Sequence, residues 1–309
     1  AGHTVSVFER EDRIGGLLMY GIPNMKLSKS VVQRRIKLLE DSGIEFRTNA
    51  DVGNNVDPAR LVNEYDATLI AIGSTIPRDI PIPGRDANGI HFAMEYLTQH
   101  TKSLLSSSLT DDNYINTQEK KVIVIGGGDT AMDCVRTAVR QNAKSVKCLY
   151  RRDRENMPGS AREVANAEEE GVEFVWLSSP KEFLGKNKIE NLVVDKIKLG
   201  EPDDSGRRKP EIQEKSEFII KADMVIKALG FDPENLPKLF NSKDLQITQW
   251  GTLKTDFDTM ETNLPGVFAA GDIIRGASLV VWAIKDGRDA ATSIENFLEN
   301  KEAKRAKVA

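Results

Sequence analysis

The stretch Val122-Ile-Val-Ile-Gly-Gly-Gly-Asp-Thr-Ala-Met-Asp133 decides the fold of this 309-residue chain. Its four β-branched residues predict a strand, and the glycines that follow predict a tight turn into a helix. Gly126 permits the turn, Gly128 lets the backbone approach a pyrophosphate, and Ala131 keeps the helix close to its strand. Because the N–H groups at a helix start face an anion, this pattern predicts the phosphate end of a dinucleotide-binding βαβ unit.

A second strand follows at the distance that such a unit requires. The run 145–149 leads into a basic turn that contains Arg151 and Arg152. An NAD-preferring unit usually carries an acid at this place for the ribose 2′-hydroxyl, whereas arginines suit a 2′-phosphate. We therefore expect NADPH rather than NADH. The alternative is a solvated basic turn that Asp153 and Glu155 balance.

The chain begins with a pattern that is typical of the middle of a second such unit. Thr4-Val-Ser-Val-Phe-Glu9 predicts a strand ending in an acid, which suits the ribose of an adenosine. The first strand and glycine loop of that unit belong about 20–30 residues earlier, and residue 1 is alanine. We expect the chain to be a fragment whose N-terminal part, with one phosphate loop, is missing.

An internal repeat supports two units of the same kind. The matching segments come in the same order: 40–46 with 168–174, 67–73 with 222–230, and 7–10 with 149–152. The place of Glu9 in the first unit is taken by Arg151 in the second. One unit therefore suits a ribose hydroxyl, and the other suits a phosphate.

Composition predicts a large, soluble α/β protein. With 39% hydrophobic and 29% charged residues, 309 residues can bury two cores of ordinary domain size. No apolar run approaches the roughly 18 residues of a membrane span, and the net charge of −4 gives no electrostatic reason for nucleic-acid binding. We expect a cytoplasmic protein with no membrane or nucleic-acid partner.

The cysteines and histidines predict neither a redox pair nor a metal site. Cys134 and Cys148 form no CxxC pair, which argues against a disulfide reductase and against an iron–sulfur cluster held by this segment. The three histidines, His3, His91 and His100, are scattered among polar residues.

The run Gly266-Val-Phe-Ala-Ala-Gly-Asp272 predicts an apolar strand that ends in Gly-Asp just before a helix. An aspartate there can bond a polyol, while the helix dipole faces an electron-rich ring edge. For Asp272 alone, an ordinary helix cap is the alternative. Together with Glu9 and the strand ends at Gly73 and Gly230, a flavin site is the better explanation.

Four long motifs resemble those of the small (β) subunits of glutamate synthase, and the likeness covers nearly the whole chain. They are Arg13-Ile-Gly-Gly-Leu-Leu-Met-Tyr-Gly-Ile-Pro23, Gly126-Gly-Gly-Asp-Thr-Ala-Met-Asp133, Tyr150-Arg-Arg-Asp-Arg-Glu-Asn-Met-Pro-Gly-Ser160 and Ala269-Ala-Gly-Asp-Ile-Ile-Arg-Gly-Ala-Ser-Leu-Val-Val-Trp-Ala-Ile284. The same module is similar to the electron-entry part of dihydropyrimidine dehydrogenase. The family's cysteine-rich cluster domain and first glycine loop are not in this sequence.

The resemblance implies a flavoprotein oxidoreductase with FAD and NADPH as cofactors. NADPH would deliver a hydride to FAD, and iron–sulfur clusters of the missing N-terminal region or of the partner would carry electrons to the large (α) subunit. That subunit makes glutamate from glutamine and 2-oxoglutarate. The hydride step needs no general acid or base from this chain, so no catalytic residue is expected; stacking and orientation of the flavin are required instead.

By the same resemblance, the FAD-binding residues are Glu9 at the adenosine ribose, Gly15 and Gly16 beside the cofactor, Gly73 beneath it, Gly271 and Asp272 at the ribityl and phosphate region, and the backbone of Leu279 and Val280 at the pyrimidine edge. The resemblance also implies that the pyrophosphate of the pyridine nucleotide is bound by Gly126, Gly127, Gly128, Asp129 and Thr130. Its 2′-phosphate would be bound by Arg151 and Arg152. Gly230 ends the strand that corresponds to the one before Gly73.

The expected fold is α/β, with two three-layer, Rossmann-like dinucleotide-binding domains, one inserted in the other. Residues 1–100 and 243–309 would form the FAD-binding domain, and residues 119–242 the NAD(P)-binding domain. Two alternatives stay open. The module serves another acceptor, as in ferredoxin–NADP or dihydropyrimidine dehydrogenase-like enzymes, or the chain is a non-enzymatic nucleotide-binding remnant.

Overall fold

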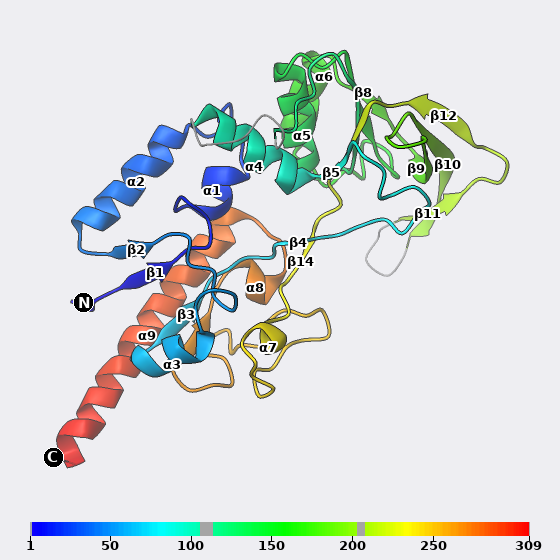
Figure 1. Cartoon of the computed structure of the whole chain (residues 1–309). Coiled ribbons are helices and arrows are strands. Elements are labelled where there is room, and N and C mark those ends of the chain that lie inside the picture. Colours follow the sequence, from blue (N-terminus) through cyan, green and yellow to red (C-terminus); the bar gives the residue numbers. More distant parts are fainter. Residues whose placement is uncertain (1, 106–113, 203–207, 309) are drawn as a thin grey trace. The chain divides into compact units, whose positions relative to one another are not determined.

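The computed structural model describes residues 2–105, 114–202 and 208–308, and the chain divides into two compact units (Figure 1). Unit 1 comprises Ala1–Ile14, Ile36–Pro77 and Phe231–Ala309, and unit 2 comprises Gly15–Arg35 and Arg78–Gly230. From the sequence we expected the chain to cross from one domain to the other near residues 100–119 and again near residue 243. Which cofactor each unit binds remains a prediction.

Unit 2 is built on a five-stranded parallel sheet with the order β5-β13-β6-β7-β8. Its strands are β5 (Ile90–Phe92), β13 (Met224–Lys227), β6 (Lys121–Ile125), β7 (Ser145–Leu149) and β8 (Glu173–Val175). The central strand β6 pairs through Val124 with Ile226 of β13 and Cys148 of β7. A central parallel strand is buried on both faces, which explains why its sequence is a continuous apolar run.

Helices cover one face of this sheet: α4 (Ala93–Leu104), α5 (Asp129–Arg140) and α6 (Ala161–Glu169). Val122 and Val124 of β6 pack in a core cluster with residues of all three helices. The alternate residues Ile123 and Ile125 belong to a second cluster on the opposite face. Side-chain alternation along one strand therefore supplies both cores.

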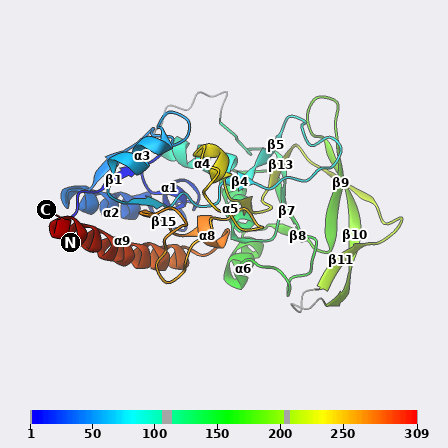
Figure 2. The ribbon, with the colours of Figure 1, turned by 90° about the horizontal axis from the view of Figure 1, so that it is seen from below.

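An antiparallel sheet forms the third layer of unit 2. It consists of β9 (Ser178–Leu184), β10 (Asn191–Pro202), β11 (Arg208–Ile212) and β12 (Phe218–Lys221), with β10 pairing to the other three. Phe183, Leu192 and Ile220 bring it into the second cluster. Figure 2 shows this sheet beside β7 and β8, on the side away from α5. Unit 2 is thus three-layered, with helices on only one face of the parallel sheet.

Unit 1 contains two short parallel strand pairs. β1 (Ser6–Phe8) pairs with β2 (Glu45–Arg47), and β3 (Thr68–Ile70) pairs with β15 (Val267–Ala269). An antiparallel pair joins β4 (Ile76–Pro77) to β14 (Phe231–Asp232). The helices of unit 1 are α3 (Pro58–Glu64), α7 (Leu236–Leu239), α8 (Asp272–Arg275) and the long α9 (Val280–Val308), while α2 (Lys29–Asp41) starts in unit 2 and ends in unit 1.

The strand pairs of unit 1 correspond to the outer pairs of the sheet in unit 2. By the internal repeat, β3 matches β13, β1 matches β7 and β2 matches β8, so β15 takes the place of β5. In unit 2, β6 joins the two pairs. Among the described residues of unit 1 no strand takes that place, and the expected first strand before residue 1 stays a prediction.

Charged residues of α5 and α6, with Glu170 at the C-cap of α6, form a partly buried network in unit 2. Arg136 bonds Glu163 at 2.7 Å and Glu170 at 2.7 Å, and Arg140 bonds Glu170 at 2.6 Å. The hydrogen bonds from Arg140 and Arg136 lower the pKa of Glu170 to about 2. None of the helices in the described part of the chain is long and apolar enough to cross a membrane.

We predict that Glu170→Gln lowers the free energy of unfolding at pH 7 by about 1–3 kcal/mol, because two charge-assisted bonds are lost. The folded-state pKa of Glu170 lies below the ordinary value of 4.5, so this stabilisation is present above pH 4.5 and is lost as the pH falls towards 2. Urea unfolding of parent and variant across this range measures the difference. Glu173→Gln, at an exposed ion pair, is the control with little effect; a difference that stays constant down to pH 2 would contradict the assignment.

Candidate functional site

The glycine turn after β6 is held in a conformation that excludes side chains. Gly126 has φ +149°, and a Cβ there would lie 2.2 Å from the carbonyl oxygen of Ala228. A Cβ on Gly127 would lie 2.3 Å from the ring of Tyr150. A Cβ on Gly128 would meet nothing within 4 Å. The first two glycines are therefore required by the fold of this unit, whereas the third faces open space.

Helix α5 starts directly after this turn, with Gly128 at its N-cap. The loop 156–160 rests against the turn, because the Gly159 N–H donates to the Gly127 carbonyl oxygen at 2.9 Å. The carboxylate of Asp129 accepts the Ser160 N–H at 3.0 Å. Asp129 thus holds this loop beside the first turn of α5, and Thr130 follows it in the same turn.

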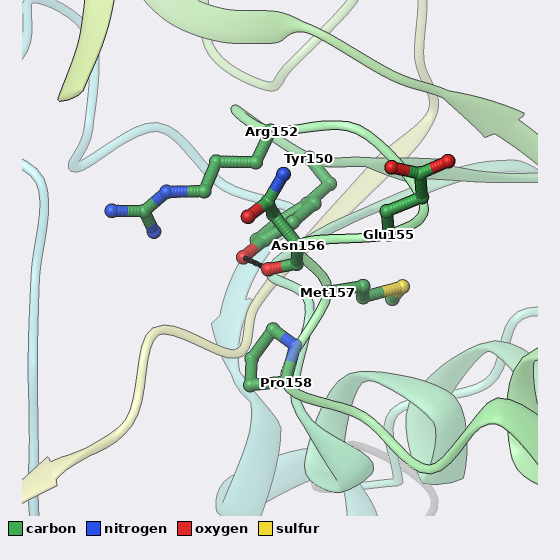
Figure 3. A pocket seen from close by; sticks show the side chains of 6 residues that line it. All are labelled: Tyr150, Arg152, Glu155, Asn156, Met157 and Pro158. Carbon is green, nitrogen blue, oxygen red and sulfur yellow. Dashed lines mark hydrogen bonds between the residues drawn. The ribbon is translucent and has the colours of Figure 1, made fainter. Parts of the chain in front are cut away.

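A pocket of about 300 Å³ lies beside the end of β7 and is shown in Figure 3. Its lining residues come from one continuous segment: Tyr150, Arg152, Glu155, Asn156, Met157 and Pro158. The Tyr150 hydroxyl donates to the Asn156 carbonyl oxygen at 3.1 Å, which closes the segment into a loop. The same tyrosine lies against Gly127, so the pocket adjoins the glycine turn.

The arginines of the basic turn differ in their surroundings. Arg154 pairs with Glu168 at 2.7 Å. Arg152 lines the pocket, and its Nε donates to the carbonyl oxygen of Arg208 on β11 at 3.3 Å. Arg151 is exposed. In the ranges that the structure covers, neither Arg151 nor Arg152 forms an ion pair, so their charges are available to an anion.

The other predicted residues of unit 2 lie in glycine turns. Gly15 and Gly16, with φ +126° and +50°, precede and begin helix α1 (Gly16–Tyr20). Gly230 has φ +94° and accepts the Arg78 N–H at 3.0 Å. Only a residue without a Cβ adopts such conformations without strain. Gly15 and Gly16 lie in unit 2, whereas the sequence led us to expect them in the domain of residues 1–100 and 243–309.

In unit 1, Glu9 directly follows β1, and one of its carboxylate oxygens accepts the Glu11 N–H at 3.0 Å. Gly73, with φ +74°, lies just beyond β3. The next residue, Ser74, donates its hydroxyl to the Asp272 carbonyl oxygen at 3.1 Å. The ends of β3 and β15 are thereby joined, and Gly73 is brought close to the turn that contains Asp272.

The Gly271–Asp272 turn opens helix α8. Gly271 has φ +80°, and Asp272 is partly buried with the Ser278 N–H as a partner of its carboxyl group. Burial raises the pKa of Asp272, and the Ser278 bond opposes this shift. Leu279, just before α9, and Val280, its first residue, are 60% and 45% exposed, and the first N–H groups of a helix have no partner within the helix.

Asp286 supports this turn and was not found from the sequence. Its side chain is fully buried, it accepts two bonds from Arg275 at 2.6 and 2.7 Å, and it bonds the backbone of Gly271. The Arg275 hydrogen bonds lower the pKa of Asp286. No sequence signal paired it with Arg275, which is 11 residues away. Tyr150 and Ser74 were also missed, although each directly adjoins a predicted residue.

The structure therefore brings the predicted residues together in two groups. The glycine turn, Asp129 and Arg152 adjoin one pocket segment of unit 2, and Gly73 adjoins Gly271 and Asp272 in unit 1. Glu9 follows a different strand pair in unit 1. In each group a strand is followed by a glycine turn and then by a helix. This is the arrangement that binds the phosphates of a dinucleotide in α/β proteins.

Comparison with known families agrees with this arrangement. Residues 2–287 match the model of the pyridine nucleotide-disulphide oxidoreductase family. The chain belongs to this family, which confirms that it is a pyridine-nucleotide-dependent oxidoreductase module and supports FAD and NADPH as its cofactors.

Relatives within the family are more specific. The chain is 55% identical over 298 residues to the "Putative glutamate synthase [NADPH] small chain" of Cereibacter sphaeroides, covering 96% of this chain and 72% of that protein. It is 53% identical over 302 residues to the "Glutamate synthase [NADPH] small chain" of Azospirillum brasilense, covering 97% of this chain and 63% of that protein. The resemblance to glutamate synthase small chains is thus confirmed, and the chain spans between 63% and 72% of these two relatives.

Among solved structures, the His57Gln mutant of FprA from Mycobacterium tuberculosis has a TM-score of 0.80 at 20% identity, covering 98% of this chain and 79% of that chain. At this identity the likeness concerns the fold alone. It confirms the expected fold class, a mixed α/β chain with two Rossmann-like domains.

Proposed function

We propose that this chain is the NADPH- and FAD-binding module of a glutamate synthase small (β) subunit. It takes a hydride from NADPH to FAD, and the electrons pass through iron–sulfur clusters outside this chain to a large (α) subunit that forms glutamate. The observation that carries the proposal is the glycine turn of unit 2 with an arginine-lined pocket beside it. A cytoplasmic location belongs to the same proposal.

The turn fits the pyrophosphate of a pyridine nucleotide. Gly126 and Gly127 let the strand ends meet, while Gly128 leaves open space at the N-terminus of α5. The N–H groups there, including those of Asp129 and Thr130, suit a dianion because the helix dipole favours negative charge. Arg151 and Arg152 supply positive charge for the 2′-phosphate. Arg152 also lines the pocket that segment 150–158 forms beside this turn.

The residues of unit 1 fit a flavin nucleotide. Glu9 keeps one carboxylate oxygen for a ribose diol while the other holds its own turn. Asp272 presents a carboxyl group at a strand end, and Leu279 and Val280 lie where α9 begins, whose first N–H groups have no partner within the helix. Gly73 and Gly271 of unit 1 adopt positive φ angles, as do Gly15 and Gly16 of unit 2, whose assignment to FAD rests on the family resemblance alone. When bound, the flavin accepts two electrons and a proton as a hydride from nicotinamide C4.

Hydride transfer requires orientation, and these residues provide it. The chain holds the pyrophosphate and the 2′-phosphate, and it fixes the ribityl chain through Asp272. Cys134 and Cys148 do not offer a dithiol exit for electrons, because both are buried and burial raises their pKa values, that of Cys148 to about 12. This favours an acceptor outside the chain, as the proposal requires.

We predict that replacing Arg151 and Arg152 with glutamine raises the dissociation constant for NADPH at least tenfold, or about 1.4 kcal/mol, and changes that for NADH little. The two arginines contact only the 2′-phosphate in this assignment. Titration of parent and variant with both nucleotides measures the effect.

Arg154→Gln is the matched control, since Glu168 already neutralises that arginine. It should leave both dissociation constants within about threefold. Equal losses for NADPH and NADH in the double variant, or tighter NADH than NADPH binding in the parent, would show that the basic turn is only a solvated surface.

We predict that Asp272→Ala in the full-length protein weakens FAD binding on the order of tenfold to a hundredfold, because a charge-assisted bond to a ribityl hydroxyl is worth about 1.5–3 kcal/mol. NADP⁺ affinity should not change. Flavin content and the FAD dissociation constant are the measurements, with exposed Asp258→Ala of the same unit as control. Unchanged FAD affinity in Asp272→Ala would leave Asp272 as an ordinary helix cap.

For the acceptor, we expect the full-length protein mixed with a glutamate synthase large subunit to form two glutamate per NADPH oxidised from glutamine and 2-oxoglutarate. Amino-acid analysis together with the NADPH absorbance gives this ratio. NADPH oxidation that proceeds only with ferredoxin or a pyrimidine would favour the first alternative. A colourless preparation that binds nucleotide without flavin would favour the non-enzymatic remnant.

A further inference from the structure

The segment Gly15–Arg35 belongs to the compact unit that contains the nucleotide turn. This segment includes Gly15 and Gly16, which we assign to FAD. Helix α1 lies in it, with Met19 and Tyr20 buried and the ring of Tyr20 beneath Lys102 of α4. A feature of the sequence that the proposed function does not use, Lys26, explains how the segment is fixed there.

Lys26 connects the segment to the nucleotide-binding helix. Its Nζ lies 2.8 Å from a carboxylate oxygen of Asp133 on α5 and 3.4 Å from one of Glu163 on α6. Asp133 is only 6% exposed, one turn beyond the glycine turn. In the part of the chain that the structure describes, Lys26 is the cation paired with Asp133.

The other charges nearby are already engaged. Glu163 also bonds Arg136 at 2.7 Å, and Arg136 bonds Glu170. Asp129, whose charge also acts on Asp133, is bonded to Ser160. Lys29, whose charge also acts on Asp133, donates to backbone carbonyl oxygens instead. Without Lys26, Asp133 would keep a buried carboxylate beside Glu163 and Asp129 with no direct ion pair among the described residues, which is strongly unfavourable. The segment is therefore held in place by a charge that α5 requires.

A second lysine makes the segment itself rigid. Lys29 is 4% exposed, and its Nζ donates to the Leu18 carbonyl oxygen at 2.9 Å and to the Ile22 carbonyl oxygen. These are carbonyls at and beyond the end of α1, where a helix lacks internal donors. Lys29 thus ties α1 to the loop that carries Lys26, so a displacement at Lys26 is transmitted to Gly15 and Gly16.

We propose that Lys26 is a positioning residue for the flavin step: its ion pair with Asp133 fastens the Gly15–Arg35 segment to the nucleotide-binding helix and so sets the place of Gly15 and Gly16. This inference rests on the proposed function for the role of the two glycines. The fastening itself is independent of it. Lys26 touches neither cofactor in this assignment and acts only through the segment.

Amide hydrogen exchange tests the fastening. In the full-length protein, Lys26→Met and Asp133→Asn should increase exchange in peptides from 15–35 at least tenfold. Lys37→Met, at an exposed lysine of α2 that pairs with Asp41, is the matched control and should change nothing there. If the unpaired Asp133 carboxylate keeps Lys26→Met from folding, the double variant Lys26→Met/Asp133→Leu, which removes both charges, takes its place and should show the same increase in exchange. Parent-like exchange in this segment overturns the proposal.

Rapid-mixing kinetics tests the positioning role. At saturating NADPH, the rate constant of flavin reduction per bound FAD should be at least tenfold lower in Lys26→Met than in the parent. The NADP⁺ dissociation constant should stay within threefold of the parent value. Lys26→Arg should recover most of the rate, because it restores a cation at Asp133. A purely structural role predicts lower thermal stability and FAD content with an unchanged rate per bound flavin, and that result overturns the proposal.

The two experiments also separate this inference from the proposed function. A parent protein whose flavin is not reduced by NADPH contradicts the proposed function and the positioning role together, and the exchange data then decide the fastening alone. A parent protein with normal reduction and a Lys26→Met variant of equal rate contradicts only the positioning role.

Discussion

The close approach of backbone segments at Gly126 and Gly127 is the constraint on which the nucleotide unit depends. A side chain at Gly126 would collide with the Ala228 carbonyl oxygen at 2.2 Å, and one at Gly127 would collide with the Tyr150 ring at 2.3 Å. Because neither is present, the ends of β6, β13 and β7 converge, and α5 can begin directly above them. The Tyr150 ring, which lines the pocket, lies directly against Gly127.

Helix α5 joins this constraint to the rest of unit 2 through two different faces. Its apolar face, with Met132 and Val135, is buried against the sheet and α4. Its charged residues Asp133, Arg136 and Arg140 form partly buried ion pairs with the segment 15–35, with α6 and with Glu170, which directly follows α6. Apolar burial stabilises the helix without specifying direction, whereas the ion pairs need defined geometry. Together they place the glycine turn relative to its neighbours.

In unit 1, the glycine turn is held by a buried charge and not by close packing of the backbone. The turn at Gly271 is supported by Asp286, which bonds both Arg275 and the Gly271 backbone. A buried carboxylate is tolerated because Arg275 supplies two hydrogen bonds to it. The carboxyl group of Asp272 lies at the strand end, where the Ser278 N–H bonds it, which suits a group that meets a polyol.

The sequence alone determined the local features of this protein, and the tertiary structure decided which segments meet. The glycine turn, the β-branched strand before it and the strand ends at Gly73 and Gly230 were predictable, because strand propensity and turn conformation depend on neighbouring residues. The packing of the antiparallel sheet against the parallel one, the grouping of Gly15–Arg35 with unit 2 and the pairing of Lys26 with Asp133, 107 residues away, were not. Contacts over such separations depend on the path of the whole chain and on which buried charge lacks a partner, and no local pattern records either.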